Sequence, residues 1–236
     1  MTSEHSSKEQ MAAGYDKVAI EYLEWARSRP DGMKHRVEIL EKLLNHLGTD
    51  QVNGDQARRK LNVLELGCGA GEPATLALAA HPAVGHIFAN DFSATQLEML
   101  RENLSKLESG AFSEKVEGAH GDMTKLEYPA GSLDAVLAYY SIIHLTQEEQ
   151  TQMVSRIHCW LKPGTGHLLC CFGLEESTGA TNNNWLGMKA FWSSHGQEKS
   201  LKMVKDAGFE VVHQEITHDP QDASFLWVIV KKKPET

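Results

Sequence analysis

The stretch from Val63 to Pro73 reads Val-Leu-Glu-Leu-Gly-Cys-Gly-Ala-Gly-Glu-Pro and overlaps a largely apolar run, Leu61–Leu66. The run is short and glycines follow it, so it predicts a buried strand that ends in a tight turn. A glycine-rich turn after a strand lets the backbone approach a nucleotide closely and lets the next helix point its amino end at it. The glycines are Gly67, Gly69 and Gly71.

The spacing of these glycines argues against a dinucleotide cofactor. The fingerprint G-x-G-x-x-G requires a third glycine at position 72, and the residue there is Glu72. Its carboxylate would face a pyrophosphate, so the sequence disfavours a nicotinamide or flavin dinucleotide.

Beyond this turn, short apolar runs alternate with helical patterns, which predicts crossover units in a mostly parallel sheet with helices on both faces. Only a loop, Thr217–Ser224, joins the last two strands, so they are predicted to form an antiparallel hairpin. The predicted fold class is α/β: a single-domain three-layer sandwich with a seven-stranded, mostly parallel sheet whose last strand is antiparallel. The predicted strands are Leu61–Leu66, His86–Asn90, Lys115–Gly118, Leu133–Tyr139, His167–Phe172, Phe209–Ile216 and Phe225–Lys231. The predicted helices between them are Ala74–Ala80, Ser93–Glu108, Gln147–Leu161 and Gln197–Ala207.

Two regions lie outside this alternation. Tyr15–Arg27 and Met33–Leu47 read as N-terminal helices that partly cover the core, with Pro30–Gly32 breaking one from the other. Gly173–His195 is rich in Asn, Gly and Trp and is too long for an ordinary connection, so it predicts a lid or functional loop. We therefore divide the predicted domain, residues 1–236, into four parts: helical cap 1–48, cofactor-binding core 61–172, substrate lid or loop 173–196, and C-terminal helix and hairpin 197–231.

Charge and composition limit the partners. The 236 residues carry a formal net charge of −9, and the only run of like positive charge is Lys231–Lys233, so no nucleic-acid partner is expected. The first ten residues lack the apolar core of a signal peptide, and no segment approaches the roughly 18–20 apolar residues that cross a bilayer, so no membrane partner is expected. Cysteine spacing fits neither a disulfide framework nor a zinc site, which predicts reduced thiols in a cytoplasmic protein. As a separate expectation, the protein is a monomer or a homodimer.

Two acidic residues at the ends of later strands are suited to bind the ribose and the base of a nucleoside. Asp91 ends the second strand, where a carboxylate can accept both ribose hydroxyls. Capping of the next helix is an alternative role for Asp91, but Ser93 suits that role better because Gln96 completes a capping box with it. After the third strand, Asp122-Met123 places an acceptor carboxylate beside an apolar side chain, which suits the edge and face of adenine.

In this combination, the sequence resembles the class I (Rossmann-like) S-adenosylmethionine-dependent methyltransferases of small-molecule type, over roughly residues 15–231. The resemblance implies that the turn from Glu65 to Gly71 wraps the methionine part, with Glu65 acting on the amino group directly or through water. Tyr15-Asp16 and Tyr22 resemble an N-terminal element whose aromatic residues close over the cofactor, although packing on the core explains them equally well. The implied cofactor contacts are Tyr15, Tyr22, Glu65, Gly67, Cys68, Gly69, Gly71, Asp91, Phe92, Gln96, Asp122, Met123 and Tyr139.

The end of the fourth strand, Ala138–His144, faces the transferable methyl group in this family. Tyr139 is expected to contact the cofactor and Tyr140 the substrate. His144 is a candidate general base, with helix capping or packing as the alternative. The motif Asn/Asp-Pro-Pro-Tyr/Phe, which is typical of enzymes that methylate base amines or glutamine amides, is absent here.

Aromatic residues of the predicted lid suit the wall of a pocket for a flat, apolar or cationic substrate. Trp185, Phe191 and Trp192 are the candidates, with an aromatic plug as the alternative. His195 is a second candidate base. The histidines lack metal-ligand spacing, so no metal is expected.

The leading hypothesis is an enzyme that methylates an aromatic or apolar small molecule at O, N, S or C. A protein or peptide methyltransferase is one alternative, but it would need an open groove. A non-catalytic partner subunit that binds S-adenosylmethionine is another, but it would have no need of intact Glu65, Asp91 and Asp122.

Overall fold

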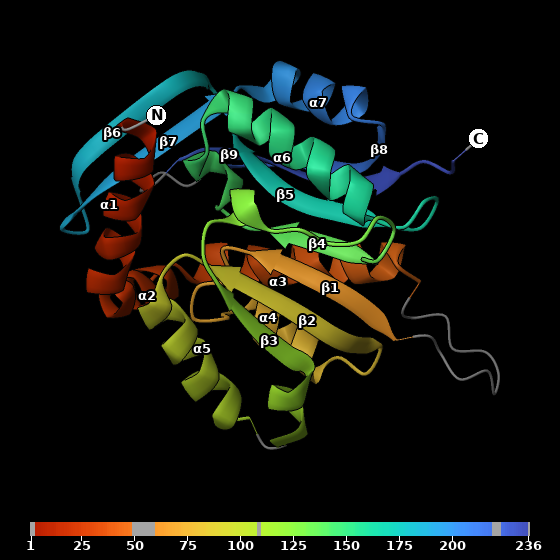
Figure 1. Cartoon of the computed structure of the whole chain (residues 1–236), viewed down its shortest axis with the longest axis horizontal. Coiled ribbons are helices and arrows are strands. Elements are labelled where there is room, and N and C mark those ends of the chain that lie inside the picture. The colour runs from red at the N-terminus through yellow and green to blue at the C-terminus, as the bar shows by residue number, and fades with distance from the viewer. Residues whose placement is uncertain (1–2, 49–59, 108–109, 219–222, 236) are drawn as a thin grey trace.

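The computed structural model describes residues 3–48, 60–107, 110–218 and 223–235. Within these residues seven strands form one sheet, in the order β3-β2-β1-β4-β5-β9-β8 (Figure 1). The strands are β1 Leu61–Leu66, β2 Val84–Asp91, β3 Val116–His120, β4 Ala135–Ala138, β5 His167–Gly173, β8 Phe209–His218 and β9 Ser224–Lys232. Neighbours pair parallel except at β9, which is antiparallel to β5 and to β8. The predicted mostly parallel sheet with an antiparallel last strand is therefore confirmed.

Helices cover both faces of this sheet (Figure 1). One face carries α3 (Pro30–His46), α4 (Ala74–Ala80) and α5 (Ala94–Ser105), and the other carries α6 (Gln147–Trp160) and α7 (Gln197–Asp206). Short 3-10 helices are η1 (Gly110–Lys115), η2 (Met123–Lys125) and η3 (Ile142–His144). Successive strand residues point to opposite faces, so Val63 packs in one core cluster and Leu64 in the other. Burial on both faces explains why β1 reads as an apolar run, and the predicted three layers are present.

The N-terminal segment differs from the prediction. Helix α1 spans Ser3–Lys17 and α2 spans Ala19–Arg27, whereas one helix beginning at Tyr15 was predicted. The buried anchors of α1 are Met11 and Tyr15, which pack with Met188 of a distant strand. A polar helix that is stabilised by tertiary contacts leaves no apolar stripe in its own sequence, so periodicity could not reveal it.

The break between the next two helices is present, but it lies at Ser28 and Arg29, just before the predicted Pro30–Gly32. Pro30 is the first residue of α3. Proline has no backbone N–H, but no hydrogen bond is lost there because the first N–H groups of a helix have no partner within the helix. Residues 49–59, between the predicted helical cap and the predicted core, lie outside the described residues. The division into cap, core, lid and C-terminal part stays a prediction.

The segment that was predicted as a lid or loop contains a regular β-hairpin. Strands β6 (Glu176–Trp185) and β7 (Met188–His195) form a two-stranded antiparallel sheet that packs beside α1 (Figure 1). Leu186 and Gly187, with φ of 51° and 85°, form the two-residue turn between them. Strand β6 is largely exposed and polar, so it shows no apolar alternation. The chain segments that enter and leave the hairpin lie side by side, and there the N–H of Gln197 donates to the carbonyl of Leu174 over 3.0 Å.

Gly71→Ala is expected to lower the free energy of unfolding by about 3 kcal/mol, from backbone strain together with overpacking. Gly71 has a φ of 86°, and a Cβ atom there would lie 2.5 Å from Cδ1 of Leu100 in the core. Chemical denaturation monitored by circular dichroism measures the loss.

Gly187→Ala is the matched control for this substitution. Gly187 has nearly the same φ, 85°, but a Cβ atom there would meet nothing within 4 Å. Only the strain remains, about 1 kcal/mol. Equal losses at both positions would contradict the close packing of Gly71 on Leu100.

Candidate active site

Two adjoining cavities lie at the carboxyl ends of β1, β2 and β4. The inner cavity is narrow, about 100 Å³, and its walls run from Lys8 and Asp122 past Asp91 to Glu65. The outer cavity, about 710 Å³, lies between the N-terminal helices, the hairpin and the start of β9. Both cavities share Tyr15, Tyr22, Arg36, Tyr140 and His144. Every residue predicted to contact the cofactor lines the inner cavity except Gly71, which packs against the core.

The glycine turn lies close to Ser141 beside the inner cavity. Gly67 and Gly69 have φ of 69° and 53°, which favours glycine. A Cβ atom on Gly67 would lie 2.5 Å from Cβ of Ser141, so no larger residue fits between the ends of β1 and β4. The turn therefore depends on glycine for both conformation and space.

Glu65 is the buried acid at the end of β1. Its Oε2 accepts a hydrogen bond from the hydroxyl of Thr75 on α4. Burial raises the pKa of Glu65 to about 8, although the Thr75 bond opposes this rise. A cation brought to this carboxylate would favour its charged form.

Asp91, at the end of β2, holds the glycine turn to the start of α5. Its Oδ2 accepts from the N–H of Gly69 over 2.8 Å and its Oδ1 from the N–H of Ser93 over 2.9 Å. Ser93 caps α5 as predicted, since its hydroxyl accepts from the N–H of Gln96 over 3.1 Å. The predicted capping box is wrong, because Asp91 and not the Gln96 side chain takes the N–H of Ser93.

Gln96 consequently presents unused polar atoms to the inner cavity. Its side-chain oxygen and nitrogen are both buried, and neither has a hydrogen-bond partner among the described residues. A buried amide without partners is costly, so a polar ligand that reached it would be bound favourably.

Arg36 is a site residue that sequence analysis missed. It projects from α3 into both cavities, where its guanidinium carbon lies 4.6 Å from the centre of the Tyr140 ring. Its Nε is buried with no hydrogen-bond partner in the described part of the chain. The available signal was a charged residue in register with the apolar face of α3, which Ile39, Leu40 and Leu43 form. The site therefore contains a cation suited to an anionic group of a ligand.

His144 lies where the two cavities meet. Its Nδ1 donates to the carbonyl of Phe191 over 2.8 Å, so its Nε2 accepts from the hydroxyl of Tyr15 over 3.1 Å. Burial lowers the pKa of His144 to about 4, which keeps the ring neutral at pH 7. The ring thereby connects α1 with β7 of the hairpin.

Aromatic rings from three parts of the chain line the outer cavity. Trp185 lies within 6 Å, between ring centroids, of Tyr15, Tyr22, Trp25 and Trp192. Trp185 and Trp192 were predicted to line a substrate pocket, whereas Trp25, which comes from α2, was not. The wall is suited to a flat or apolar molecule.

Two predicted site residues lie elsewhere. His195 donates from Nε2 to the carbonyl of Gln147 over 2.9 Å and lines neither cavity. The ring of Phe191 also lines neither cavity, and Phe191 acts on the site through its carbonyl bond to His144. Among the described residues no group of three or more His, Cys, Asp or Glu side chains is arranged to hold a metal ion. Within that same part of the chain, no helix combines the length and apolarity that a membrane span requires.

A parallel sheet in this order, with a glycine turn after its central strand and acids at the ends of β1, β2 and β3, defines the Rossmann-like class of nucleotide-binding enzymes. Residues 63–164 match the family described as methyltransferase domain. This match, over less than half of the chain, supports a class I S-adenosylmethionine-dependent methyltransferase.

Solved structures of methyltransferases share the fold. The complex of DhpI with SAH superposes with a TM-score of 0.66, covering 96% of this chain and 97% of that one at 16% identity. Magnesium protoporphyrin IX methyltransferase from Synechocystis, with bound SAM, gives a TM-score of 0.64, covering 94% of this chain and 95% of that one at 16% identity.

Curated relatives match part of their length. Phosphoethanolamine N-methyltransferase 3 of Arabidopsis thaliana is 27% identical over 64% of this chain, and sterol 24-C-methyltransferase ERG6B of Gibberella zeae is 27% identical over 71%. The matches span 29% and 44% of those two proteins.

Proposed function

We propose that this protein transfers a methyl group from S-adenosylmethionine to a small organic acceptor that is aromatic or apolar. The observation that carries the proposal is the aromatic outer cavity, which adjoins the inner cavity at Tyr15, Tyr140 and His144. Similar structures include enzymes named for small molecules, magnesium protoporphyrin IX and 1,6-didemethyltoxoflavin. A protein or peptide acceptor would favour an open groove over a wall of side chains from helix and hairpin.

The inner cavity offers a chemical match for each part of the cofactor. Adenine would lie between Phe92 and Met123 with Asp122 at its edge, and Asp91 would take the ribose hydroxyls. At the other end, Glu65 suits the amino group, and Arg36 suits the carboxylate, because its buried Nε needs an acceptor. The unpartnered amide of Gln96 lies along the same wall.

Bound S-adenosylmethionine supplies a methyl group on a sulfonium, and the chain's own task is to align the acceptor and exclude water. Tyr15 and His144 close the junction of the cavities through their hydrogen bond. His144 is a weak base at neutral pH, with a pKa of about 4, so its position supports alignment more than proton removal.

Cofactor binding at pH 7 is expected to release about one proton from Glu65. The free protein holds this carboxyl mostly protonated, because its pKa is about 8. The ammonium of the ligand favours the carboxylate, so binding lowers the pKa and the proton leaves. Calorimetry with S-adenosylhomocysteine in buffers of different ionisation enthalpy counts the protons.

Glu65→Gln is expected to abolish this proton release. Glu72→Gln changes another carboxyl of the same turn, which is already ion-paired with Arg27, and is expected to retain the proton release. Proton release that persists in Glu65→Gln would assign the titration to another group.

Transfer of a labelled methyl group to a cell extract, separated into small molecules and polymers, tests the proposed activity. Label in the small-molecule fraction supports it. Label only in macromolecules would favour the protein or peptide acceptor. Binding of S-adenosylhomocysteine with no transfer to any fraction would favour a non-catalytic subunit.

A further inference from the structure

Helix α1 forms one wall of the inner cavity and is attached to the core at both ends. Near its C-terminal end, Asp16 accepts from the hydroxyl of Ser93 over 2.6 Å and from the N–H of Thr95 over 3.0 Å. Toward its N-terminal end, Lys8 reaches across the cavity to the opposite side. Met11 and Tyr15, between these attachments, line the cavity itself.

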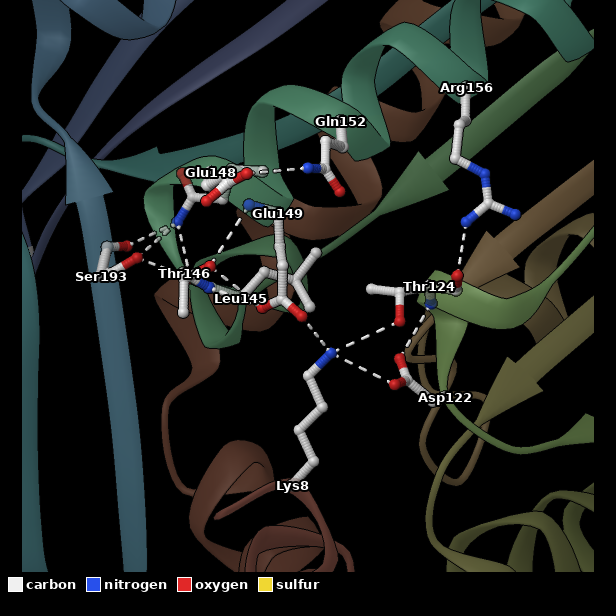
Figure 2. Close-up of polar contacts among 11 residues, drawn as sticks. Lys8, Asp122, Thr124, Leu145, Thr146, Glu148, Glu149, Gln152, Arg156 and Ser193 are labelled. Atoms are coloured by element: carbon white, nitrogen blue, oxygen red, sulfur yellow. Dashed lines mark hydrogen bonds and ion pairs between the residues drawn. The ribbon is translucent and has the colours of Figure 1, made fainter. Parts of the chain in front are cut away.

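Lys8 joins three parts of the fold through one ammonium group (Figure 2). Its Nζ lies 3.2 Å from Oδ2 of Asp122 and 3.4 Å from Oγ1 of Thr124, and it also pairs with Oε1 of Glu149. Asp122 follows β3, and Glu149 lies in the first turn of α6. We call this arrangement the Lys8 bridge.

Each carboxylate of the Lys8 bridge is held in place by a second contact. Oδ1 of Asp122 accepts from the N–H of Thr124 over 2.9 Å. Oε2 of Glu149 accepts from the N–H of Thr146 over 3.0 Å, as part of the capping box of α6. The side chains of Lys8, Asp122 and Glu149 are 24–29% exposed, so solvent weakens the pairs less than at an open surface.

The inner cavity is small for a bound nucleoside, so we infer that one of its walls moves on binding. Its volume of about 100 Å³ is well below the roughly 300–1,000 Å³ of small-molecule sites. Helix α1 contributes Lys8, Met11 and Tyr15 to the lining. The remaining walls are the strand ends, the glycine turn and residues of α2, α3 and α5, among them Tyr22, Arg36 and Gln96.

We propose that Lys8 is a positioning residue that holds helix α1 closed over the adenine end of the cofactor site, with Glu149 as its fixed anchor. The inference rests on the proposed cofactor site. When the amino group of adenine donates to Asp122, Lys8 keeps its pair with Glu149, so the helix stays closed over the bound nucleoside. The Lys8 bridge thus sets how fast the cofactor leaves.

Dissociation of S-adenosylhomocysteine from the full chain, followed by stopped-flow tryptophan fluorescence, tests the proposal. Trp185 contacts Tyr15 of α1 with ring centroids 5.9 Å apart, so opening of the helix changes its surroundings. Lys8→Met is expected to accelerate dissociation about tenfold, since most affinity changes appear in the rate of release.

Glu149→Gln tests the anchor from the other side. Glutamine retains the capping box with Thr146 but removes the charge, so release is expected to quicken as in Lys8→Met. The double variant is expected to be no faster than either single one. Lys17→Met, which removes an exposed charge from the same helix, is the control and is expected to release at the wild-type rate.

Lys8→Arg keeps the charge and is expected to retain slow release. Unchanged release in Lys8→Met and Glu149→Gln, or equal acceleration in Lys8→Met and Lys8→Arg, would overturn the proposal. If Lys8→Met does not fold, Glu149→Gln decides the question alone. Failure of the wild type to bind S-adenosylhomocysteine would instead refute the proposed function.

Discussion

Asp91→Ala is expected to weaken binding of S-adenosylhomocysteine about a thousandfold, because two hydrogen bonds to a charged acceptor are each worth about 1.5–3 kcal/mol. The carboxylate is buried at the end of β2 and faces the inner cavity between the glycine turn and Phe92. Its ribose bonds would be made where water is excluded, which increases the loss. Calorimetry measures the affinity.

The same carboxylate also supports the fold locally, so the test needs a control. Asp91 accepts from the N–H groups of Gly69 and Ser93. Asp91→Asn keeps one acceptor oxygen and removes the charge, and it is expected to fall between wild type and Asp91→Ala. Binding that is unchanged in Asp91→Ala, with a lowered melting temperature, would assign Asp91 to helix capping alone.

Arg36→Gln is expected to weaken S-adenosylhomocysteine binding about a hundredfold, since removing one partner of a desolvated charge pair costs about 2–5 kcal/mol. Arg36 has a buried Nε without a partner in the described residues, so its guanidinium can accommodate a carboxylate. 5′-Methylthioadenosine lacks that carboxylate, and its affinity is expected to stay the same. Calorimetry with both ligands separates charge recognition from damage to the site.

Lys34→Gln is the control for Arg36→Gln. Lys34 lies on the same helix with its side chain 74% exposed, and it pairs with Glu38. Its loss is expected to change neither affinity. If Arg36→Gln weakened the binding of both ligands equally, Arg36 would have a structural role. If it weakened the binding of neither, Arg36 would not contact the cofactor and would be a candidate contact for the methyl acceptor.

The sequence sufficed for the sheet and for most of the inner cavity because those signals are local. Strand β1 and helix α4 lie where the apolar runs place them, since burial on both faces produces continuous apolar sequence. The glycine turn, Asp91 and Asp122 were assigned from their order at strand ends, and parallel strands bring such ends together. Their individual contacts with a cofactor stay predictions.

The residues that were missed depend on contacts between distant segments. Lys8 and Trp25 belong to helices whose partners are strand ends and a hairpin far along the chain, so neither has a local pattern. Arg36 appears in the sequence as one charge in an amphipathic helix. The capping box was predicted wrongly from residue spacing alone. Asp91 accepts the hydrogen bond from the N–H of Ser93 that the Gln96 side chain was expected to accept, and the spacing of Ser93 and Gln96 does not reveal this.

The bond between Gln197 and Leu174 brings the two ends of the hairpin segment together, so the chain returns to the point where it left the core. Closure of such a segment depends only weakly on its length. Residues 175–196 supply Trp185 and Trp192 to the outer cavity and none of the predicted cofactor contacts. If the proposed function holds, exchanging residues 175–196 between relatives is expected to change which acceptor is methylated and to leave cofactor binding unchanged.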